Sequence, residues 1–326
     1  MKACVIGGKI KGESTMKIFQ TMNDSGKFDS VLFIPIENIT LGVKEGKSSV
    51  TYRNIDLSDF DVIVPRIGAS KAWFAYQMLK MLENTDTYIP LKPETPLISH
   101  DKFLTLEVLN KHGIPIPETY LALSPSAAKR VIGDKIKPPL IMKLLGGTQG
   151  KGVMFAKDTN SAEGIVDTLN VLNQSLFIEK YIKNPGEDIR VVVLGDEVIT
   201  SAKRKAKQGD IRSNLGSGGK YQSYRVNSEI ADLAVKSAEA IGAEICGVDI
   251  IQGKKGPVVI EVNIALGMKI CEVTGVDIPK KIVHYVSEKG MQGKNVKKLS
   301  CFFEKELGKI PKIFKEIVKG KEDKDD

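Results

Sequence analysis

The chain contains few cysteines and histidines, and this limits the chemistry available to it. The four cysteines lack CxxC spacing, so they indicate neither a disulfide framework nor a zinc site. They are Cys4, Cys246, Cys271 and Cys301. The three histidines also lack metal-ligand spacing, so any enzymatic chemistry is expected to rest on other residue types. They are His100, His112 and His284.

Long apolar runs are also missing. No segment approaches the ~20 apolar residues that a membrane-spanning helix needs. Residues 1–12 lead directly into a short apolar strand and lack the apolar stretch and cleavage pattern of a signal peptide. We therefore expect a cytoplasmic protein without a membrane partner. The 326 residues, 42% hydrophobic and 27% charged, suit two or three packed subdomains.

The formal net charge of +8 is compatible with a nucleic-acid partner, but its distribution does not favour one. Between Lys203 and Arg225, seven basic residues stand against one acid, with only Tyr221 and Tyr224 as aromatic residues. Proteins that stack single-stranded bases usually carry more aromatic side chains in such a patch. Residues 289–326 hold eleven lysines and seven acids, which gives +4, half of the total. Nucleic acid is therefore not expected to be the main partner.

The first third of the chain alternates between strand and helix patterns. Strands are predicted over 2–7, 31–36 and 61–68, with helices over 13–24 and 70–84. This alternation favours a parallel α/β unit.

The next segment predicts a small α+β unit. A helix over 99–112 is predicted to begin at a capping Ser99 and to end before a glycine. Apolar strands are predicted over 139–145 and 176–182, with a glycine-rich loop at 146–152 after the first of them.

Longer antiparallel strands are predicted after residue 186. Residues 189–206 read as a hairpin that turns at Gly195-Asp196, followed by a helix over 228–241. The strands 246–252 and 257–263 flank a second turn.

The division of the chain follows from these changes in pattern. The predicted domains are 1–97 (N-terminal α/β), 98–185 (central α+β), 186–290 (C-terminal, with antiparallel strands) and 291–326 (basic extension). Helical spacing over 302–320 is broken by Pro311. It predicts either a helix docked on the core with a frayed end or a basic arm for a partner or substrate.

The second hairpin carries the strongest chemical signal. Its turn centres near residue 255, which places Asp249 opposite Glu261, and Asn263 lies two residues further along on the same face. Three hard oxygen ligands on one patch suit Mg²⁺ or Mn²⁺. The alternative is a strand pair with ordinary polar residues, but Glu261 interrupts an otherwise apolar strand. We therefore predict a metal site.

The loop Gly146–Gly152 contains four glycines in seven residues, which lets backbone N–H groups turn toward an anion. It does not match a Walker A motif. Lys143 lies just before it, within an apolar strand, where burial without a partner would be costly and a phosphate would supply one. An ordinary glycine-rich hairpin turn is the alternative interpretation.

Two further segments carry candidate ligand-binding groups. The carboxylate of Glu179 would suit the adenine amino group. The backbone of 180–182 (Lys180, Tyr181, Ile182) would suit the purine edge, and Asp188 would suit the ribose hydroxyls. Each is otherwise a surface charge or strand backbone. A basic stretch would suit phosphate and carboxylate oxygens, with a solvated basic face as the alternative. It contains Lys203, Arg204, Lys205, Arg212, Ser213 and Asn214.

Taken in order, these elements resemble the ATP-grasp superfamily and, within it, the RimK-type α-L-glutamate ligases. The resemblance covers about residues 1–288 and rests on Lys102, Lys143, GGTQGKGV, EKYI, Asp188-Ile-Arg190, KRKAKQGDIRSN, GVDI and EVN. The most specific stretches are PRIGAS (65–70), RKAKQGDIRSNLGSGG (204–219) and TGVDI (274–278). The resemblance implies an ATP-grasp fold with an N-terminal Rossmann-like pre-ATP-grasp domain, a small lid subdomain and a C-terminal antiparallel-sheet domain.

The resemblance also implies roles for individual residues. Lys102 and Lys143 would contact ATP phosphates. Our own prediction is that Arg204 stabilises an acyl phosphate, and that Arg204 and Lys143 are the catalytic residues. Asp249, Glu261 and Asn263 would hold Mg²⁺ or Mn²⁺, with two ions expected. The remaining nucleotide-binding residues would be Gly147, Gln149, Gly150, Gly152, Glu179, Lys180, Tyr181, Ile182, Asp188, Lys203, Arg212, Ser213 and Asn214.

One motif departs from the family. The metal asparagine is usually followed there by Ala-Ser-Pro-Gly, whereas Asn263 is followed by Ile264-Ala265-Leu266-Gly267. The departure leaves the metal ligands in place and affects the neighbouring substrate contacts.

The expected function is ATP-dependent addition of L-glutamate, or a similar amino acid, to an acceptor carboxylate through an acyl phosphate. The acceptor would be an acidic coenzyme or a protein C-terminus, and a homo-oligomer is expected. An ATP-grasp kinase and a non-catalytic ATP sensor are the alternatives. A dinucleotide-dependent oxidoreductase is not supported, because residues 7–12 lack G-x-G-x-x-G.

Overall fold

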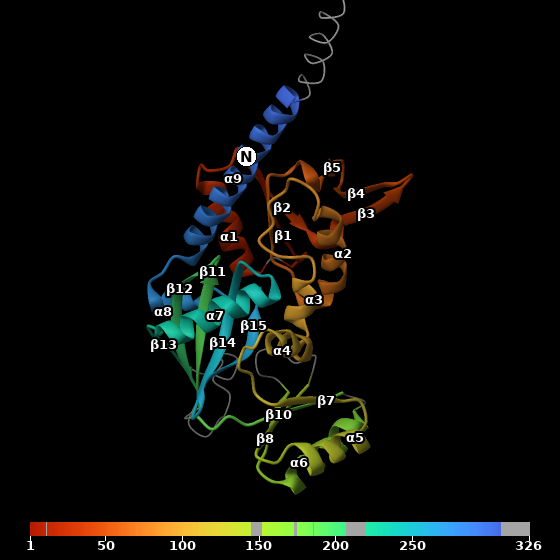
Figure 1. The fold of residues 1–326 in the computed structure, drawn as a ribbon, viewed down its shortest axis with the longest axis vertical. Helices are drawn as coiled ribbons and strands as arrows, with labels where there is room; N and C mark the ends of the chain where they lie inside the picture. Colours follow the sequence, from red (N-terminus) through yellow and green to blue (C-terminus); the bar gives the residue numbers. More distant parts are fainter. Residues whose placement is uncertain (11, 145–151, 173–174, 185, 207–219, 308–326) are drawn as a thin grey trace, which may run out of the picture.

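The computed structural model describes residues 1–10, 12–144, 152–172, 175–184, 186–206 and 220–307, with backbone alone over 294–307. Within them, the strands form four sheets, and the four-stranded sheet lies with its own helices α5 and α6 at one end of the molecule (Figure 1). The predicted combination of α/β and α+β architecture is therefore confirmed.

The N-terminal domain is built on a parallel sheet in the order β2-β1-β6. Its strands are β1 (Lys2–Gly7), β2 (Ser30–Pro35) and β6 (Val62–Pro65), with helices α1 (Glu13–Asp24) and α2 (Ala72–Leu82) and the 3-10 turn η3 (Ala69–Lys71). Side chains of a strand alternate between its faces, and both faces of this sheet are covered. Cys4 and Ile6 therefore enter one buried cluster, while Ala3 and Val5 enter another.

A second, antiparallel sheet in this domain was not predicted. It contains β3 (Ile39–Lys44), β4 (Lys47–Tyr52) and β5 (Ile55–Asp56), with the 3-10 turns η1 (Ile36–Asn38) and η2 (Leu57–Asp59) at its ends. The alternation of Ile39, Leu41 and Val43 with other residues is the strand signal in this segment. The β3–β4 hairpin projects from the domain (Figure 1).

The predicted single helix over 99–112 is wrong. The structure has two helices, α3 (Thr95–His100) and α4 (Lys102–Lys111), and the N-cap of the second is Asp101 rather than Ser99. The Asp101 carboxylate accepts from the backbone N–H groups of Phe103 and Leu104, both at 2.9 Å. Extended backbone at Asp101 interrupts the helix and lets this side chain cap the new one.

The central unit contains an antiparallel sheet in the order β7-β10-β8-β9, with helices on one side (Figure 1). Its elements are β7 (Thr119–Ala122), α5 (Pro125–Arg130), the π-helical turn η4 (Val131–Lys135), β8 (Leu140–Lys143), β9 (Val153–Ala156), α6 (Thr159–Val171) and β10 (Leu176–Lys180). Its buried residues form a separate cluster, Core 3, which includes Leu140, Met142 and Ile178. The unit thus has its own small core.

The C-terminal unit is an antiparallel sheet in the order β13-β12-β11-β14-β15. Its elements are β11 (Glu187–Leu194), β12 (Glu197–Lys205), β13 (Lys220–Ser223), α7 (Ser228–Ile241), β14 (Ile245–Gly253), β15 (Gly256–Asn263) and α8 (Lys269–Thr274). The predicted hairpin at Gly195-Asp196 and the predicted helix over 228–241 are confirmed.

Two buried clusters join the N-terminal and C-terminal sheets. Core 1 holds Cys4 and Ile6 together with Val191, Val248 and the buried side of α7. Core 2 holds Ala3 and Val5 together with Val192, Leu194 and residues of α8 and of the helix that follows it. Because neighbouring strand residues enter different cores, the two sheets are fixed to each other on both faces.

The last described helix is α9 (Ile278–Leu307), which runs without a break through the predicted boundary between 290 and 291. It packs on α1 and β6, so this helix also ties the C-terminal segment to the N-terminal domain. The predicted helix over 302–320 lies in α9 up to residue 307, and the rest falls outside the described residues. No helix in the described part of the chain has the length and apolar character needed to cross a membrane.

Gly290 is expected to be required for the close packing of α9 on β6. A Cβ atom there would lie 2.5 Å from Val62 Cγ2 and 3.3 Å from Met1 Sδ, whereas a Cβ at Gly293 would meet nothing within 4 Å. Gly290→Ala should lower the free energy of unfolding by about 1–3 kcal/mol through overpacking. Urea denaturation followed by circular dichroism measures this change.

Gly293→Ala is the matched control in the same helix. It should raise stability by up to about 1 kcal/mol, because alanine is the better helix former. Equal stability changes in the two variants would contradict the proposed packing.

Candidate functional site

The β14–β15 hairpin pairs the acids as the sequence predicts, with Asp249 opposite Glu261. The pairing near the turn has Gly253 opposite Gly256, and the register shifts between Asp249 and Ile250. This bulge inserts one extra residue in β15 before Glu261. The bulge is the reason that the two carboxylates share a row across the sheet.

The site occupies one end of the sheet face opposite α7. Arg190 of β11, Asp249 of β14 and Glu261 of β15 stand in one row, because each pairs directly with the next. Asn263 lies two residues beyond Glu261, on the same face. The other end of this face continues into Core 2 at Val192. The polar residues therefore lie directly beside packed apolar side chains.

Asp249 is the centre of a buried charge network. Arg190 donates to both of its carboxylate oxygens, through Nε to Oδ1 and through Nη2 to Oδ2 at 2.7 Å. Arg204 Nη2 lies 2.8 Å from Asp249 Oδ2. Burial by itself would raise the pKa of Asp249, but the two guanidinium groups outweigh it and hold the pKa below its ordinary value. Asp249 is thus ionised at neutral pH.

Arg204 joins this network to Asp188. Its Nε donates to Asp188 Oδ1 at 2.5 Å, and both side chains are almost fully buried. Burial opposes the charge of Arg204, but Asp249 and Asp188 raise its pKa well above the ordinary value. Lys203, predicted beside it, instead pairs with Glu187 at 3.2 Å and lies over the Tyr224 ring.

The predicted metal ligands have the donor atoms that a divalent cation needs. Glu261 is half-buried, and no described residue forms a hydrogen bond or ion pair with its carboxylate. The side-chain Nδ2 of Asn263 is buried without a hydrogen-bond partner among the described residues. Rotation of this amide would present Oδ1 instead, and the two orientations are chosen by the available partners. These residues fit a cation such as Mg²⁺, with Asp249 shared between it and the arginines.

Two predicted phosphate-binding lysines lie near the same space. Lys143 of β8 donates to both carboxylate oxygens of Glu179, at 2.9 and 3.0 Å. Lys102, at the start of α4, interacts electrostatically with Glu261 and Lys143, and burial lowers its pKa. β8, α4 and β15 therefore contribute charges to one region. The partner of Lys143 in this structure is Glu179, where the sequence suggested a phosphate.

The predicted adenine-binding segment is at the end of β10. Glu179 is buried against Lys143, and Tyr181 packs edge-to-face on Phe155 with ring centroids 5.0 Å apart. The backbone N–H of Lys180 donates to Glu118 O and that of Tyr181 to Pro139 O. Among the predicted backbone donors, the Ile182 amide is therefore the remaining candidate for reading a purine edge.

Several predicted site residues lie outside the described part of the chain. They are Gly147, Gln149, Gly150, Arg212, Ser213 and Asn214. Gly152 is described and closes the base of the loop, where Leu144 N donates to Gly152 O at 3.0 Å. Its φ is +80°, and a Cβ atom there would lie 2.8 Å from Leu144 Cδ1, so both the backbone and the packing require glycine.

Two residues of this network carried no predicted role. Arg190 makes a two-point contact with Asp249 from a strand 59 residues away in sequence. Gly247 leaves space for it, because a Cβ there would lie 3.0 Å from Arg190 Cδ. The motif GVDI thus needs its glycine for packing against an arginine. Only the non-sequential pairing of β11 with β14 brings these residues together.

Comparison with known families gives two adjacent matches. The family described as the RimK PreATP-grasp domain matches residues 1–95, and that of the RimK-like ATP-grasp domain matches residues 99–286. The chain belongs to the RimK family. RimK-family membership makes it an enzyme, an ATP-dependent ligase that forms carbon–nitrogen bonds.

Curated relatives in the RimK family span nearly the whole chain. A probable alpha-L-glutamate ligase of Methanococcoides burtonii is 34% identical over 297 residues, covering 90% of this chain and 98% of the relative. The ribosomal protein bS6–L-glutamate ligase of Escherichia coli is 34% identical over 249 residues, covering 76% and 83%. The family assignment expected from the motifs is therefore confirmed.

Solved structures confirm the ATP-grasp fold. The ATP-grasp ligase PsnB, complexed with a precursor variant, Mg and ADP, has a TM-score of 0.67 at 17% identity, covering 88% of this chain and 98% of PsnB. A RiPP-associated ATP-grasp ligase of Chryseobacterium gregarium, complexed with ADP and peptides, has a TM-score of 0.66 at 19% identity, covering 88% and 97%. At these identities the likeness concerns the fold alone.

The two acids of the site should respond differently to removal. Asp249→Ala removes the carboxylate that the buried Arg190 and Arg204 guanidinium groups share, so it should cost about 3–5 kcal/mol of stability as well as turnover. Glu261→Ala breaks no hydrogen bond or ion pair within the described residues, so it should abolish turnover and change stability by less than about 1 kcal/mol. Steady-state ADP release and urea denaturation measure the two effects.

The exposed Glu197, on the same sheet, supplies a control as Glu197→Ala, with unchanged turnover and stability expected.

The lowered pKa of Asp249 adds a pH signature. Its ionised form stabilises the fold above the unfolded pKa of about 3.9, and this contribution is lost as pH falls through the folded-state pKa. Near-normal turnover in either alanine variant would remove the metal assignment.

Proposed function

We propose that this RimK-family ligase joins L-glutamate, or a similar amino acid, to a carboxylate of an acidic acceptor. The observation that carries the proposal is the convergence of Lys102, Glu261 and the Asp249 network on one region between the lid and the C-terminal sheet. Relatives named as glutamate ligases, 34% identical to this chain, support glutamate as the amine.

The proposed reaction has two steps. An oxygen of the acceptor carboxylate attacks the γ-phosphorus of ATP, the bond to the β-phosphate oxygen breaks, and an acyl phosphate and ADP form. The amine nitrogen of glutamate then attacks the acyl carbon, the carbon–oxygen bond to phosphate breaks, and the nitrogen loses a proton. The products are the amide, ADP and inorganic phosphate.

No covalent intermediate with the protein is needed in this scheme. Cys4 and Cys246 are buried, which raises the pKa of both thiols, that of Cys246 to about 12, so neither is a thiolate at neutral pH. Catalysis would instead rest on positioning and on fixed charges in a water-poor site. Arg204, held by Asp188 and Asp249, is the proposed cation beside the transferred phosphoryl group.

Glu261, Asn263 and Asp249 would hold Mg²⁺ or Mn²⁺, and two ions are proposed. When bound, such ions neutralise phosphate charge and orient the phosphoryl group. The Mg and ADP in the PsnB structure support the use of this metal and nucleotide. Lys102 and Lys143 would contact the phosphates, while Glu179, the Ile182 amide and Asp188 would contact the adenosine.

The acceptor is proposed to be an acidic coenzyme or the C-terminus of a protein. The bS6 ligase among the relatives supports a protein C-terminus. A positively charged site suits such an acceptor, since each added glutamate makes the product more negative. Lys203 and Lys205 on β12 belong to the predicted basic stretch, and in this structure both pair with Glu187.

The test is ADP release from the purified protein with ATP and Mg²⁺, each amino acid in turn, and a panel of acidic coenzymes and ribosomal protein tails. The expected result is ADP release that requires both glutamate and one acceptor, with a product heavier by one glutamyl unit by mass spectrometry. Glu261→Ala protein, assayed in parallel, controls for contaminating ATPase activity.

The other outcomes contradict the proposal in distinct ways. ADP release with an acceptor but without any amine would identify a kinase. Nucleotide binding without turnover under all these conditions would favour an ATP sensor.

Lys143 supplies a sharper test of nucleotide binding. Because Lys143→Met alone leaves Glu179 buried without its partner, the informative variant is Lys143→Met combined with Glu179→Gln. If Lys143 contacts phosphate, the double variant should bind ATP at least about 10-fold more weakly than wild type, because one charge-assisted hydrogen bond is lost. Isothermal titration calorimetry measures the affinity.

Two controls separate the explanations. Glu179→Gln alone keeps an acceptor oxygen and should lose much less affinity, and Lys157→Ala removes an exposed lysine of the lid without effect. Wild-type ATP affinity in the double variant would mean that Lys143 serves only to neutralise Glu179.

A further inference from the structure

Arg66 is a buried arginine of the N-terminal domain whose charge has no carboxylate partner within the described residues. It follows the last residue of β6, and its backbone N–H donates to Ile6 O at 2.7 Å. This hydrogen bond fixes the Arg66 backbone at the carboxyl end of the parallel sheet. Its side chain is only 7% exposed. Burial lowers its pKa to about 10, so it remains charged at neutral pH. A buried cation of this kind needs specific acceptors.

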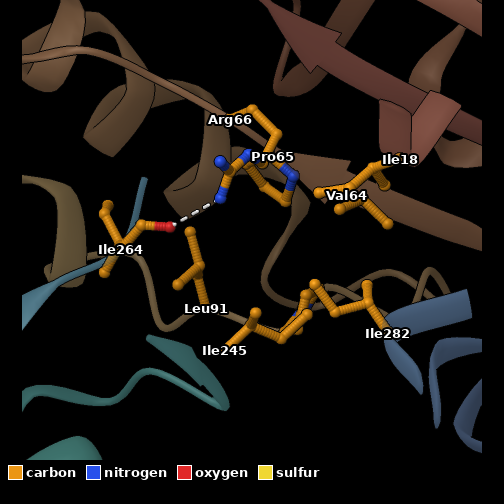
Figure 2. A pocket seen from close by; sticks show the side chains of 9 residues that line it. Ile18, Val64, Pro65, Arg66, Leu91, Ile245, Ile264 and Ile282 are labelled. Atoms are coloured by element: carbon orange, nitrogen blue, oxygen red, sulfur yellow. Dashed lines mark hydrogen bonds between the residues drawn. The ribbon is translucent and has the colours of Figure 1, made fainter. Parts of the chain in front are cut away.

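The acceptors are backbone carbonyls that follow the proposed metal ligand Asn263. Arg66 Nη1 donates to Ile264 O at 3.1 Å, and Nη2 donates to Leu266 O at 2.6 Å (Figure 2 shows the first of these bonds). A weaker contact joins Nη2 to Ser14 Oγ at 3.4 Å. The guanidinium thus donates to the carbonyls of two alternate residues in one short segment. This segment follows Asn263, the last residue of β15.

The surroundings of Arg66 offer few other polar groups. It borders a small cavity where Ile18 and Val64 of the N-terminal domain face Ile245 of β14 and Ile282 of α9 (Figure 2). Its Nε is buried without a partner among the described residues. The Ile264 and Leu266 carbonyls are therefore the principal acceptors that hold the guanidinium, and the guanidinium in turn holds them.

Apart from Arg66, the described residues anchor the segment 264–267 through its own side chains. Ile264 is buried in Core 1 and Leu266 in Core 2, while Ala265 and Gly267 are exposed. Burial of alternate side chains sets the direction of the segment. Without Arg66, however, the carbonyls of Ile264 and Leu266 would face an apolar region and would lack this hydrogen-bond donor. Arg66 satisfies them from a different domain.

We propose that Arg66 is a positioning residue, which holds the Ile264–Leu266 backbone so that Asn263 and Glu261 are oriented to bind the metal–nucleotide complex. The proposal rests on the metal site proposed above. It makes the N-terminal domain part of the ligase site through one guanidinium. Groups that orient metal ligands without contacting the metal themselves typically change metal affinity by about 10–100-fold.

The test measures Mn²⁺ binding in the presence of ADP, with free Mn²⁺ followed by electron paramagnetic resonance. The full-length wild type is compared with Arg66→Met, Arg66→Lys, Glu261→Gln and Arg53→Met, the last an exposed arginine of the same domain. We expect Arg66→Met to raise the Kd for Mn²⁺ by about 10–100-fold. Arg66→Lys, which keeps the charge but not the two-pronged contact, should fall between it and wild type, and Arg53→Met should match wild type.

A purely structural role would lower thermal stability but leave the Kd of the folded protein unchanged, so that result would overturn the proposal. Tighter Mn²⁺ binding by Arg66→Met would also overturn it, because Arg66 would then act as a repelling charge. If Arg66→Met does not fold, Arg66→Lys decides: a raised Kd supports the proposal and a wild-type Kd overturns it.

Failure of the metal site itself would look different. If wild type and Glu261→Gln bound Mn²⁺ equally, the metal assignment would fall, and the role of Arg66 with it. If Glu261→Gln alone lost binding while both Arg66 variants kept it, the metal site would stand and only the positioning role would fail.

Discussion

Two arginines share one buried carboxylate at Asp249, and the arrangement of the site depends on this charge. Arg190 reaches it from β11 and Arg204 from β12, so three strands of the sheet are joined through side chains as well as through their backbone ladder. Burying charges is costly unless they are paired. The network therefore holds Arg204 in a defined place before any substrate arrives, which is what electrostatic catalysis requires.

The same network limits what a metal can do at this site. Both oxygens of Asp249 already accept hydrogen bonds from guanidinium groups, whereas Glu261 and Asn263 have side-chain atoms without such partners in the described region. A cation would therefore find two available ligands and one that it shares. Negative phosphate groups would compensate the additional positive charge, so metal and nucleotide are expected to bind together.

The departure from the family motif after Asn263 has a structural explanation. Ile264 and Leu266 extend into different cores, and their carbonyls accept from Arg66. Apolar residues at these two positions anchor the segment between the domains, while the arginine contacts involve backbone atoms that any sequence provides. The substituted side chains thus serve packing between the sheets, and Asn263 stays at the end of its strand.

Local patterns determined the elements that carry the site. The turn and alternation around residues 246–263 were enough to predict that Asp249 and Glu261 lie together on the hairpin, and the bulge in β15 completes their direct pairing. The interruption of the helix at Asp101 was missed, because a capping side chain competes locally with a longer helical pattern. The β3–β5 sheet was missed because the alternation of apolar residues in it is weak. The pairings Arg190–Asp249, Lys143–Glu179 and Arg66–Ile264 were decided only by the tertiary structure. They join residues 59, 36 and 198 positions apart, and no local periodicity records which distant strands become neighbours.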